Sequence, residues 1–437
     1  MQPLAVYVHI PFCAKKCAYC DFLSFPPDAF AEGKETVQRR YFDALLREID
    51  LAAGEMPLRE RAVQSIYFGG GTPTYADSRD IKAVLQRLRQ RFFVLPDAEI
   101  SLECNPGATT AEELGALRDA GVNRLSIGAQ SFLDEELRLL GRIHSAEDAR
   151  ECFAAARDAG FSNISLDLMA ALPGQTQDAL LFNVKSAMSL APEHLSLYSL
   201  IIEPGTPFFE RYAGEVQDPH FDRPVYRTSD NATAGKDGLP EVGDDDGRHL
   251  PGEEEERAML HAAWSVLEEN GYFRYEISNF TRTAAAGMDA GACGKRQAQD
   301  YRCRQNLVYW ERGEYLGLGL GSASLIAETR FSNTRKLYAY LEAFVTDDPL
   351  RAIREDTEHL GEASRMEEFM FLGLRLREGV EESRFADAFS VRIDEVYGET
   401  LDRLAASGLL LRRDGRVFLT NTGTDLANTA MAEFLLS

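Results

Sequence analysis

The chain has 437 residues, 45% of them hydrophobic and 27% charged, which is typical of a soluble globular protein of two or three domains. It contains no run of roughly 18 apolar residues and no charged and then apolar leader, so we expect no membrane span, no secretion signal and a cytoplasmic location. The net charge of -23 argues against a nucleic-acid partner, and seven cysteines, three of them clustered, favour a reducing compartment over a disulfide framework.

Short β-rich segments alternate with longer segments of helical periodicity from Leu4 to about Ile202. Six strands that alternate with helices predict a parallel α/β sheet, either an open doubly wound sheet or a partial barrel. The expected strands are 4–10, 64–68, 98–103, 123–128, 164–168 and 194–201, and the expected helices are 38–53, 78–92, 110–120, 134–140, 145–159 and 176–190.

The second half of the chain is less regular. Residues 226–256 carry ten acidic against three basic side chains and few large apolar ones, which predicts a disordered insertion, and a second polar insertion is expected near 283–301. From about Ser364, three helices and a hairpin with Asp-Gly at its turn predict a winged-helix-like domain, for which we favour a lid or partner-docking role because the segment is not basic. The expected division is a core at 1–225, an insertion at 226–256, barrel completion at 257–345 and a C-terminal domain at 360–437.

Three cysteines, Cys13, Cys17 and Cys20, lie within eight residues directly after the first expected strand. A [4Fe–4S] cluster is held by cysteine thiolates and normally takes four, so three leave one iron open to another molecule. Structural zinc prefers four protein ligands, and no further pair is placed to complete such a site. Three unrelated buried thiols would have no reason to share one loop.

Polar or glycine residues also stand at the carboxyl ends of the other strands, as Gly70-Gly71-Thr72, Glu103, Gln130 and Asp167 do. Parallel α/β barrels place their active sites at that edge. We therefore expect these segments and the cysteine loop to converge on one site.

The spacing C-x3-C-x2-C, with Tyr19 before the third cysteine and the segment Tyr7-Val-His-Ile-Pro-Phe before the first, resembles radical S-adenosylmethionine (SAM) proteins. It is most similar to the branch that contains the anaerobic coproporphyrinogen III dehydrogenases (HemN) and the HemW heme chaperones. The resemblance implies an α/β fold with a partial (β/α)6 barrel and a C-terminal α+β winged-helix-like domain. It also implies a [4Fe–4S] cluster on the three cysteines, with SAM on the fourth iron.

The same resemblance implies roles for single residues. Gly70, Gly71 and Thr72 would contact the methionyl amino group of SAM, and Glu103 the ribose hydroxyls. Three more residues, together with Gly71 and Thr72, would contact a second SAM or the substrate pocket, and two tyrosines would pack beside SAM. The three residues are Gln130, Arg142 and Asp167, and the tyrosines are Tyr7 and Tyr19. The structural alternatives are a loop cap for Glu103, a buried Arg142–Asp167 ion pair, and core positions for the tyrosines.

Several segments favour the HemW group within this branch. Phe22 stands where the coproporphyrinogen enzyme typically has another cysteine, and 141–144, 172–176 and 275–280 are HemW-like. A HemW-like protein would bind heme or a porphyrin, deliver it to acceptor proteins that include membrane-associated ones, and need a reductant for its cluster. The alternatives are an enzyme that oxidatively decarboxylates coproporphyrinogen III and an interaction protein without turnover.

One departure concerns heme. Family members usually carry His-Asn-x-x-Tyr-Trp, whose histidine is linked to heme binding, whereas this chain has Gln305 at that place. A second family histidine is replaced within 321–324. Glutamine is a poor iron ligand beside imidazole or thiolate. Cys303, Cys293 or one of the remaining histidines is therefore a candidate axial ligand.

Overall fold

A computed structural model describes residues 3–55, 58, 61–215, 247–282 and 300–436. Most of the two expected polar insertions, at 226–256 and 283–301, lies outside the described residues. No helix in the described ranges is both long enough and apolar enough to span a bilayer.

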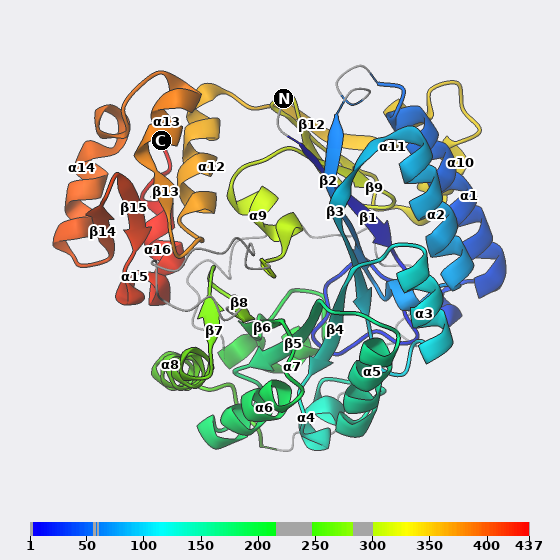
Figure 1. Cartoon of the computed structure of the whole chain (residues 1–437), viewed down its shortest axis with the longest axis horizontal. Coiled ribbons are helices and arrows are strands. Elements are labelled where there is room, and N and C mark those ends of the chain that lie inside the picture. Colours follow the sequence, from blue (N-terminus) through cyan, green and yellow to red (C-terminus); the bar gives the residue numbers. More distant parts are fainter. Residues whose placement is uncertain (1–2, 56–57, 59–60, 216–246, 283–299, 437) are drawn as a thin grey trace, which may run out of the picture.

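Six parallel strands lie side by side in chain order and form the centre of the sheet (Figure 1). All six strands and all six helices expected between residues 4 and 202 are confirmed, with ends that shift by a few residues. The strands are β1 (Leu4–Ile10), β2 (Ala62–Gly70), β3 (Phe93–Cys104), β4 (Arg124–Gln130), β5 (Ile164–Ala170) and β6 (His194–Ser199). The helices are α1 (Lys34–Ala52), α2 (Ser78–Arg91), α3 (Ala111–Asp119), α4 (Asp134–Leu139), α5 (Ala146–Asp158) and α6 (Gln177–Ser189).

Further strands extend this sheet on both sides, to the order β12-β11-β10-β9-β1-β2-β3-β4-β5-β6-β8-β7. On one side β9 pairs parallel with β1, and on the other β8 pairs antiparallel with β6. These strands are β7 (Tyr272–Arg274), β8 (Asn279–Arg282), β9 (Tyr315–Leu318), β10 (Ala323–Ile326), β11 (Thr329–Asn333) and β12 (Arg354–His359). The remaining helices before residue 360 are α7 (Pro207–Tyr212), α8 (Glu253–Glu269), α9 (Arg304–Trp310), α10 (Leu337–Ala343) and α11 (Pro349–Ile353), with short 3-10 turns η1 (Pro27–Ala29), η2 (Pro73–Tyr75) and η3 (Ala213–Glu215).

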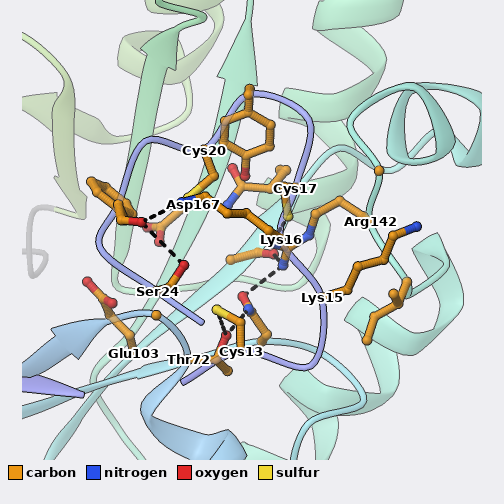
Figure 2. Close-up of a pocket in the computed structure, with 18 of the residues that line it drawn as sticks. Cys13, Lys15, Lys16, Cys17, Cys20, Ser24, Thr72, Glu103, Arg142 and Asp167 are labelled. Carbon is orange, nitrogen blue, oxygen red and sulfur yellow. Dashed lines mark hydrogen bonds between the residues drawn. The ribbon is translucent and has the colours of Figure 1, made fainter. Parts of the chain in front are cut away.

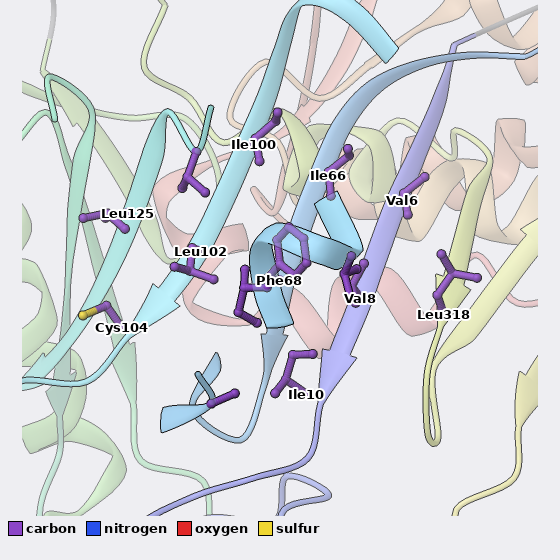
Figure 3. Close-up of a cluster of buried hydrophobic side chains, with 14 of the residues drawn as sticks. Val6, Val8, Ile10, Ile66, Phe68, Ile100, Leu102, Cys104, Leu125 and Leu318 are labelled. Atoms are coloured by element: carbon purple, nitrogen blue, oxygen red, sulfur yellow. The ribbon is translucent and has the colours of Figure 1, made fainter. Parts of the chain in front are cut away.

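The two faces of the central strands differ sharply in polarity. Apolar side chains such as Val8, Phe68 and Leu102 belong to one buried core that includes residues of the surrounding helices (Figure 3). Alternate residues point to the other face, as strand geometry requires. Polar residues at these alternate positions include Ser65, Glu103, Arg124, Ser126, Ser165, Asp167 and His194. The inside of the partial barrel is therefore polar.

Helix α8 corrects the expectation of disorder at the end of 226–256, because its first turn contains Glu253–Glu256, whereas 226–246 lie outside the described residues. Carboxylates in the first turn of a helix are stabilised by the helix dipole and by the free backbone N–H groups. The run of four glutamates that suggested a solvated acidic segment is therefore a helix start.

The C-terminal region forms its own hydrophobic cluster, which contains Met370, Phe385 and Phe434. The expected hairpin is present, with Asp414 at φ 55° and Gly415 at φ 73°, the backbone that a tight hairpin turn requires. A third strand and two terminal helices were not expected. The elements are α12 (Glu362–Gly373), β13 (Val380–Glu381), α13 (Glu382–Phe389), α14 (Ile393–Ala406), β14 (Leu410–Arg413), β15 (Arg416–Leu419), α15 (Asn421–Asp425) and α16 (Ala427–Ala432).

Candidate cofactor site

A cavity of about 370 Å³ opens at the carboxyl edge of the central strands. Cys13, Cys17 and Cys20 all line it, and residues at the ends of β2 to β6 form the rest of its wall. Figure 2 shows the three cysteines around one open region, with Arg142, Thr72 and Asp167 nearby. The predicted convergence of separate strand ends and the cysteine loop on one place is confirmed.

The backbone of the cysteine loop is held at several points. The Cys13 N–H donates to Phe25 O at 3.1 Å, and the Ala18 N–H donates to Leu140 O at 3.0 Å. These anchors use main-chain atoms only, and the three cysteines are free thiols. The loop thus presents three sulfur donors to one cavity.

The charges beside these thiols suit metal-bound thiolates. Burial raises the pKa of Cys13, and it raises the pKa of Cys20 to about 12, so without a cation the pocket favours neutral thiols. Arg142 Nη1 donates to Cys17 Sγ at 3.6 Å and brings one positive charge. No three His, Cys, Asp or Glu side chains in the described ranges are placed to hold a single metal ion. Three free thiols and an adjacent guanidinium fit the ligand set of a [4Fe–4S] cluster with one open iron.

Glu103 joins the glycine segment to the cavity. The Tyr67 hydroxyl donates to Glu103 Oε1 at 3.0 Å, and the Gly70 N–H donates to Oε2 at 3.1 Å. Burial raises the pKa of this carboxyl to about 7. At Gly71 a Cβ would lie 2.7 Å from Phe12 O, so glycine lets the two loops touch.

Asp167 and Gln130 also line the cavity. Ser126 Oγ and Ser165 Oγ donate to Asp167 Oδ1 at 3.1 and 3.3 Å, and burial raises the pKa of Asp167. The Tyr198 hydroxyl donates to Gln130 Oε1 at 2.7 Å. Each of these two side chains therefore has a fixed orientation before any ligand binds.

The contacts of Arg142 differ from the buried Arg142–Asp167 ion pair that was the structural alternative. Its Nη2 donates to Asn105 Oδ1 at 2.7 Å and to Gly128 O at 2.8 Å, in addition to the contact with Cys17. No ion pair with Asp167 occurs among the described residues. The alternative of a buried Arg142–Asp167 pair is wrong.

Two predicted site residues, Tyr7 and Gly70, do not line the cavity, whereas Tyr19 does. The Tyr7 hydroxyl is 3.1 Å from His9 Nδ1, and its ring stacks on Tyr67 at 6.2 Å. Gly70 reaches the site only through Glu103. Gly70 contacts a residue of the cavity wall in this structure, and the expected contacts of both residues with SAM stay predictions.

Sequence reasoning missed Asn105, which connects two parts of the site. Its Nδ2 donates to Thr72 Oγ1 at 2.7 Å, while its Oδ1 accepts from Arg142. The signal in the sequence was its position two residues after Glu103, which places it on the same face of an extended segment. Other missed lining residues are Lys15, Lys16, Phe22, Ile143, His144, Tyr198 and Ile201.

The helix that carries Gln305 lies inside the barrel, against β1 and β2 (Figure 1). Ser65 Oγ donates to Gln305 Oε1, and Gln305 Nε2 donates to Tyr309, both at 2.8 Å. Gln305 and Cys303 are each 1% exposed and neither lines the cavity. Cys303 is therefore closed to a porphyrin in this structure, and Cys293 lies outside the described residues.

Among the described histidines, His144 alone lines the cavity. Its Nε2 is 3.1 Å from Ala129 O, and its Nδ1 is buried without a hydrogen-bond partner. Burial lowers the pKa of His144 to about 4, so the ring is neutral at pH 7. The imidazoles of the other described histidines have hydrogen-bond partners and do not line the cavity. The partners are the Tyr7 hydroxyl and the Leu23 carbonyl for His9, Ser165 and Tyr275 for His194, Glu215 for His249, Asp425 for His261 and Thr329 for His359.

Known proteins match this chain along its length. The Radical SAM superfamily matches residues 7–182, and the HemN C-terminal domain matches 361–426. The chain is 34% identical to the heme chaperone HemW of Bacillus subtilis (strain 168), over 99% of both chains. It is 30% identical to that of Escherichia coli (strain K12), over 96% of this chain and 97% of the relative.

The same architecture occurs in a solved structure, that of coproporphyrinogen III oxidase (HemN) from Escherichia coli, a radical SAM enzyme. The TM-score is 0.74 at 25% sequence identity, over 99% of this chain and 90% of that one. Similarity at this level extends across both the barrel and the C-terminal region, so it is not limited to the cysteine loop. With 34% identity to a HemW protein over almost every residue of both, this chain belongs to the HemW family of radical SAM proteins.

Proposed function

We propose that this chain is a heme chaperone, which binds heme and passes it to acceptor proteins. The observation that carries the proposal is the 34% identity with the Bacillus subtilis heme chaperone HemW over 99% of both chains. The partners that this function requires are a heme acceptor and a reductant for the cluster. We further propose that the acceptors include membrane-associated proteins.

We also propose that the cavity holds a [4Fe–4S] cluster on Cys13, Cys17 and Cys20. SAM would lie beside it, with Glu103 as hydrogen-bond acceptor for ribose hydroxyls and with Gly71 and Thr72 near the methionyl end. Gln130, Arg142 and Asp167 would contact a second SAM or the porphyrin-binding region. Such a cluster can supply an electron to SAM, while the protein contributes position and shelter.

The second candidate function is the oxidative decarboxylation of coproporphyrinogen III. The similarity to HemN, with a TM-score of 0.74 over 99% of this chain, favours it. Phe22 stands where that enzyme typically has a further cysteine, which favours the chaperone instead.

The deciding experiment is anaerobic reconstitution with iron and sulfide, followed by hemin titration with and without SAM. A parallel sample is incubated with coproporphyrinogen III, SAM and dithionite. Uptake of one heme per chain, its transfer to an apoprotein acceptor and no decarboxylated product support the chaperone. Decarboxylated product and 5′-deoxyadenosine without heme uptake would overturn it in favour of the enzyme.

A further inference from the structure

Three large apolar side chains stand exposed around the cavity, and we call Phe22, Ile143 and Ile201 the apolar rim. Their exposed fractions are 67%, 63% and 68%, and all three line the cavity. They come from the cysteine loop, from the segment between α4 and α5, and from the segment after β6. Single exposed apolar residues are ordinary, but three around one opening mark a surface for an apolar ligand.

Positive charge lies beside the rim on the cysteine loop. Lys15 is exposed and makes no hydrogen bond or ion pair with the described part of the chain. Lys16 Nζ donates to Phe22 O at 3.1 Å, which ties one lysine to the rim. Asp21 and Glu203 also line the cavity, and Asp21 lies on the same loop, so the excess of positive charge there is local to Lys15 and Lys16. On a chain of net charge -23, two adjacent lysines here favour a ligand that is apolar over most of its area and anionic at one edge.

The helix of Gln305 offers no comparable surface. Both ends of the Gln305 amide are hydrogen bonded within the barrel, and its side chain and that of Cys303 are almost completely buried. A flat macrocycle could reach neither without moving α9 away from β1 and β2. The exposed rim needs no such movement.

We propose that heme docks on the apolar rim, with its ring over Phe22, Ile143 and Ile201 and its propionates toward Lys15 and Lys16. This inference rests on the proposed heme-binding function and names the surface that performs it. Heme fits because one face of its ring is apolar and its two carboxylates lie at one edge. In this position heme covers the opening of the cavity that holds the cluster cysteines.

The test is hemin titration of the reconstituted full-length protein and of two double variants, read by absorbance. The rim variant is Phe22→Ser with Ile201→Ser. The control is Phe93→Ser with Val345→Ser, which removes apolar side chains that are 66% and 83% exposed but do not line the cavity. We expect the rim variant to raise the hemin dissociation constant at least about tenfold, from lost apolar contact, and the control to leave it unchanged. Cluster absorbance, which both variants should keep, shows that the cysteine loop is intact.

A third variant, Lys15→Ala with Lys16→Ala, tests the orientation of the heme. We expect weaker hemin binding with less dependence on salt concentration, since two charge contacts with the propionates are lost. If the wild-type protein takes up no hemin, the proposed function itself fails. If it binds hemin and the rim variant binds equally well, this inference is overturned while the function stands. Self-association that the rim variant abolishes, with unchanged hemin affinity, would assign the surface to a second copy of the chain and also overturn the inference.

Discussion

At the scale of single residues, Arg142 contributes the positive charge nearest the cluster cysteines, through its contact with Cys17 at 3.6 Å. Replacing it with Met is expected to shift the midpoint potential of the reconstituted cluster to more negative values by on the order of 50 mV or more. The reason is that a charge at this distance is worth at least about 1 kcal/mol and favours the reduced, more negative cluster. Redox titration followed by electron paramagnetic resonance measures the shift. Arg138→Met, an exposed neighbour that donates to Asp134 O, is the control, and an equal potential in both variants would contradict the role of Arg142.

If Glu103 binds SAM as proposed, SAM binding is expected to depend on pH, because burial raises the pKa of Glu103 to about 7. If the ionised carboxylate accepts the ribose hydrogen bonds, SAM affinity should be about tenfold weaker at pH 6 than at pH 8. Anaerobic calorimetry across this range, with Glu103→Gln as the comparison, checks it. The Glu103→Gln variant should bind SAM weakly at every pH in this range. An equal change of SAM affinity with pH in the two proteins would show that Glu103 is not the group responsible.

The same raised pKa acts on stability in the ligand-free protein with a definite sign. In the folded state Glu103 stays protonated up to about pH 7, whereas in the unfolded state it loses its proton above its ordinary pKa of 4.5. The contribution of Glu103 is therefore present below pH 4.5 and is lost as pH rises through about 7. Under the proposed role of Glu103, SAM binding above pH 7 is expected to offset this loss, because SAM would bind the ionised form.

His144 is the described histidine that lines the cavity, and its Nδ1 has no hydrogen-bond partner. If heme docks on the apolar rim, His144 is the described imidazole nearest to hand as an axial ligand, since it lines the same cavity. His144→Ala should then shift the Soret maximum of bound heme, while His9→Ala would test a histidine whose two ring nitrogens are both engaged. An unchanged Soret band in His144→Ala would exclude this ligand.

At the scale of secondary-structure elements, two glycines of the C-terminal region give a matched comparison. Gly415 has φ 73° in the hairpin turn, Gly398 lies within α14, and at both positions an added Cβ would meet no heavy atom of the surrounding structure within 4 Å. Gly415→Ala should lower the unfolding free energy by about 1–2 kcal/mol, because only backbone strain is added. Gly398→Ala should raise it by up to about 1 kcal/mol through helix propensity. Calorimetric unfolding measures both, and changes of the same sign would contradict the turn geometry.

The elements themselves were largely predictable, because local patterns specify them. Alternation and caps located all six central strands, and Asp414-Gly415 located the hairpin turn. The pairing of β9 with β1 was not predictable, since it joins segments far apart in sequence with no local signal. Tyr7 shares the polar inner face with Glu103 but does not line the cavity, so its packing beside SAM stays a prediction. Phe22, Ile143 and Ile201 lie on three loops that are far apart in sequence, and only the fold brings them around one opening. The sequence could therefore predict the cluster ligands but not the apolar rim.

At the scale of the whole molecule, the rim and the cofactor site share one opening, so their ligands should affect each other kinetically. If heme covers the opening, SAM already inside should leave at least about tenfold more slowly when hemin is bound. Release of radiolabelled SAM into excess unlabelled SAM, with and without hemin, measures this. The Phe22→Ser, Ile201→Ser variant should lose the effect, and equal release rates in the wild-type protein with saturating hemin would contradict a shared opening.

The position of β1 in the sheet also bears on how the chain is made. Ala5 pairs with Ser65 on one side and with Tyr315 on the other, about 310 residues later. At 5–20 residues per second, β9 leaves the ribosome roughly 15–60 s after β1. Until β9 is made, β1 has at most one neighbouring strand, and at least one of its sides presents unpaired backbone groups beside the cysteine loop. The nascent chain is thus open to wrong strand pairing next to its cluster ligands, and slow synthesis or early cluster insertion would act on that same intermediate.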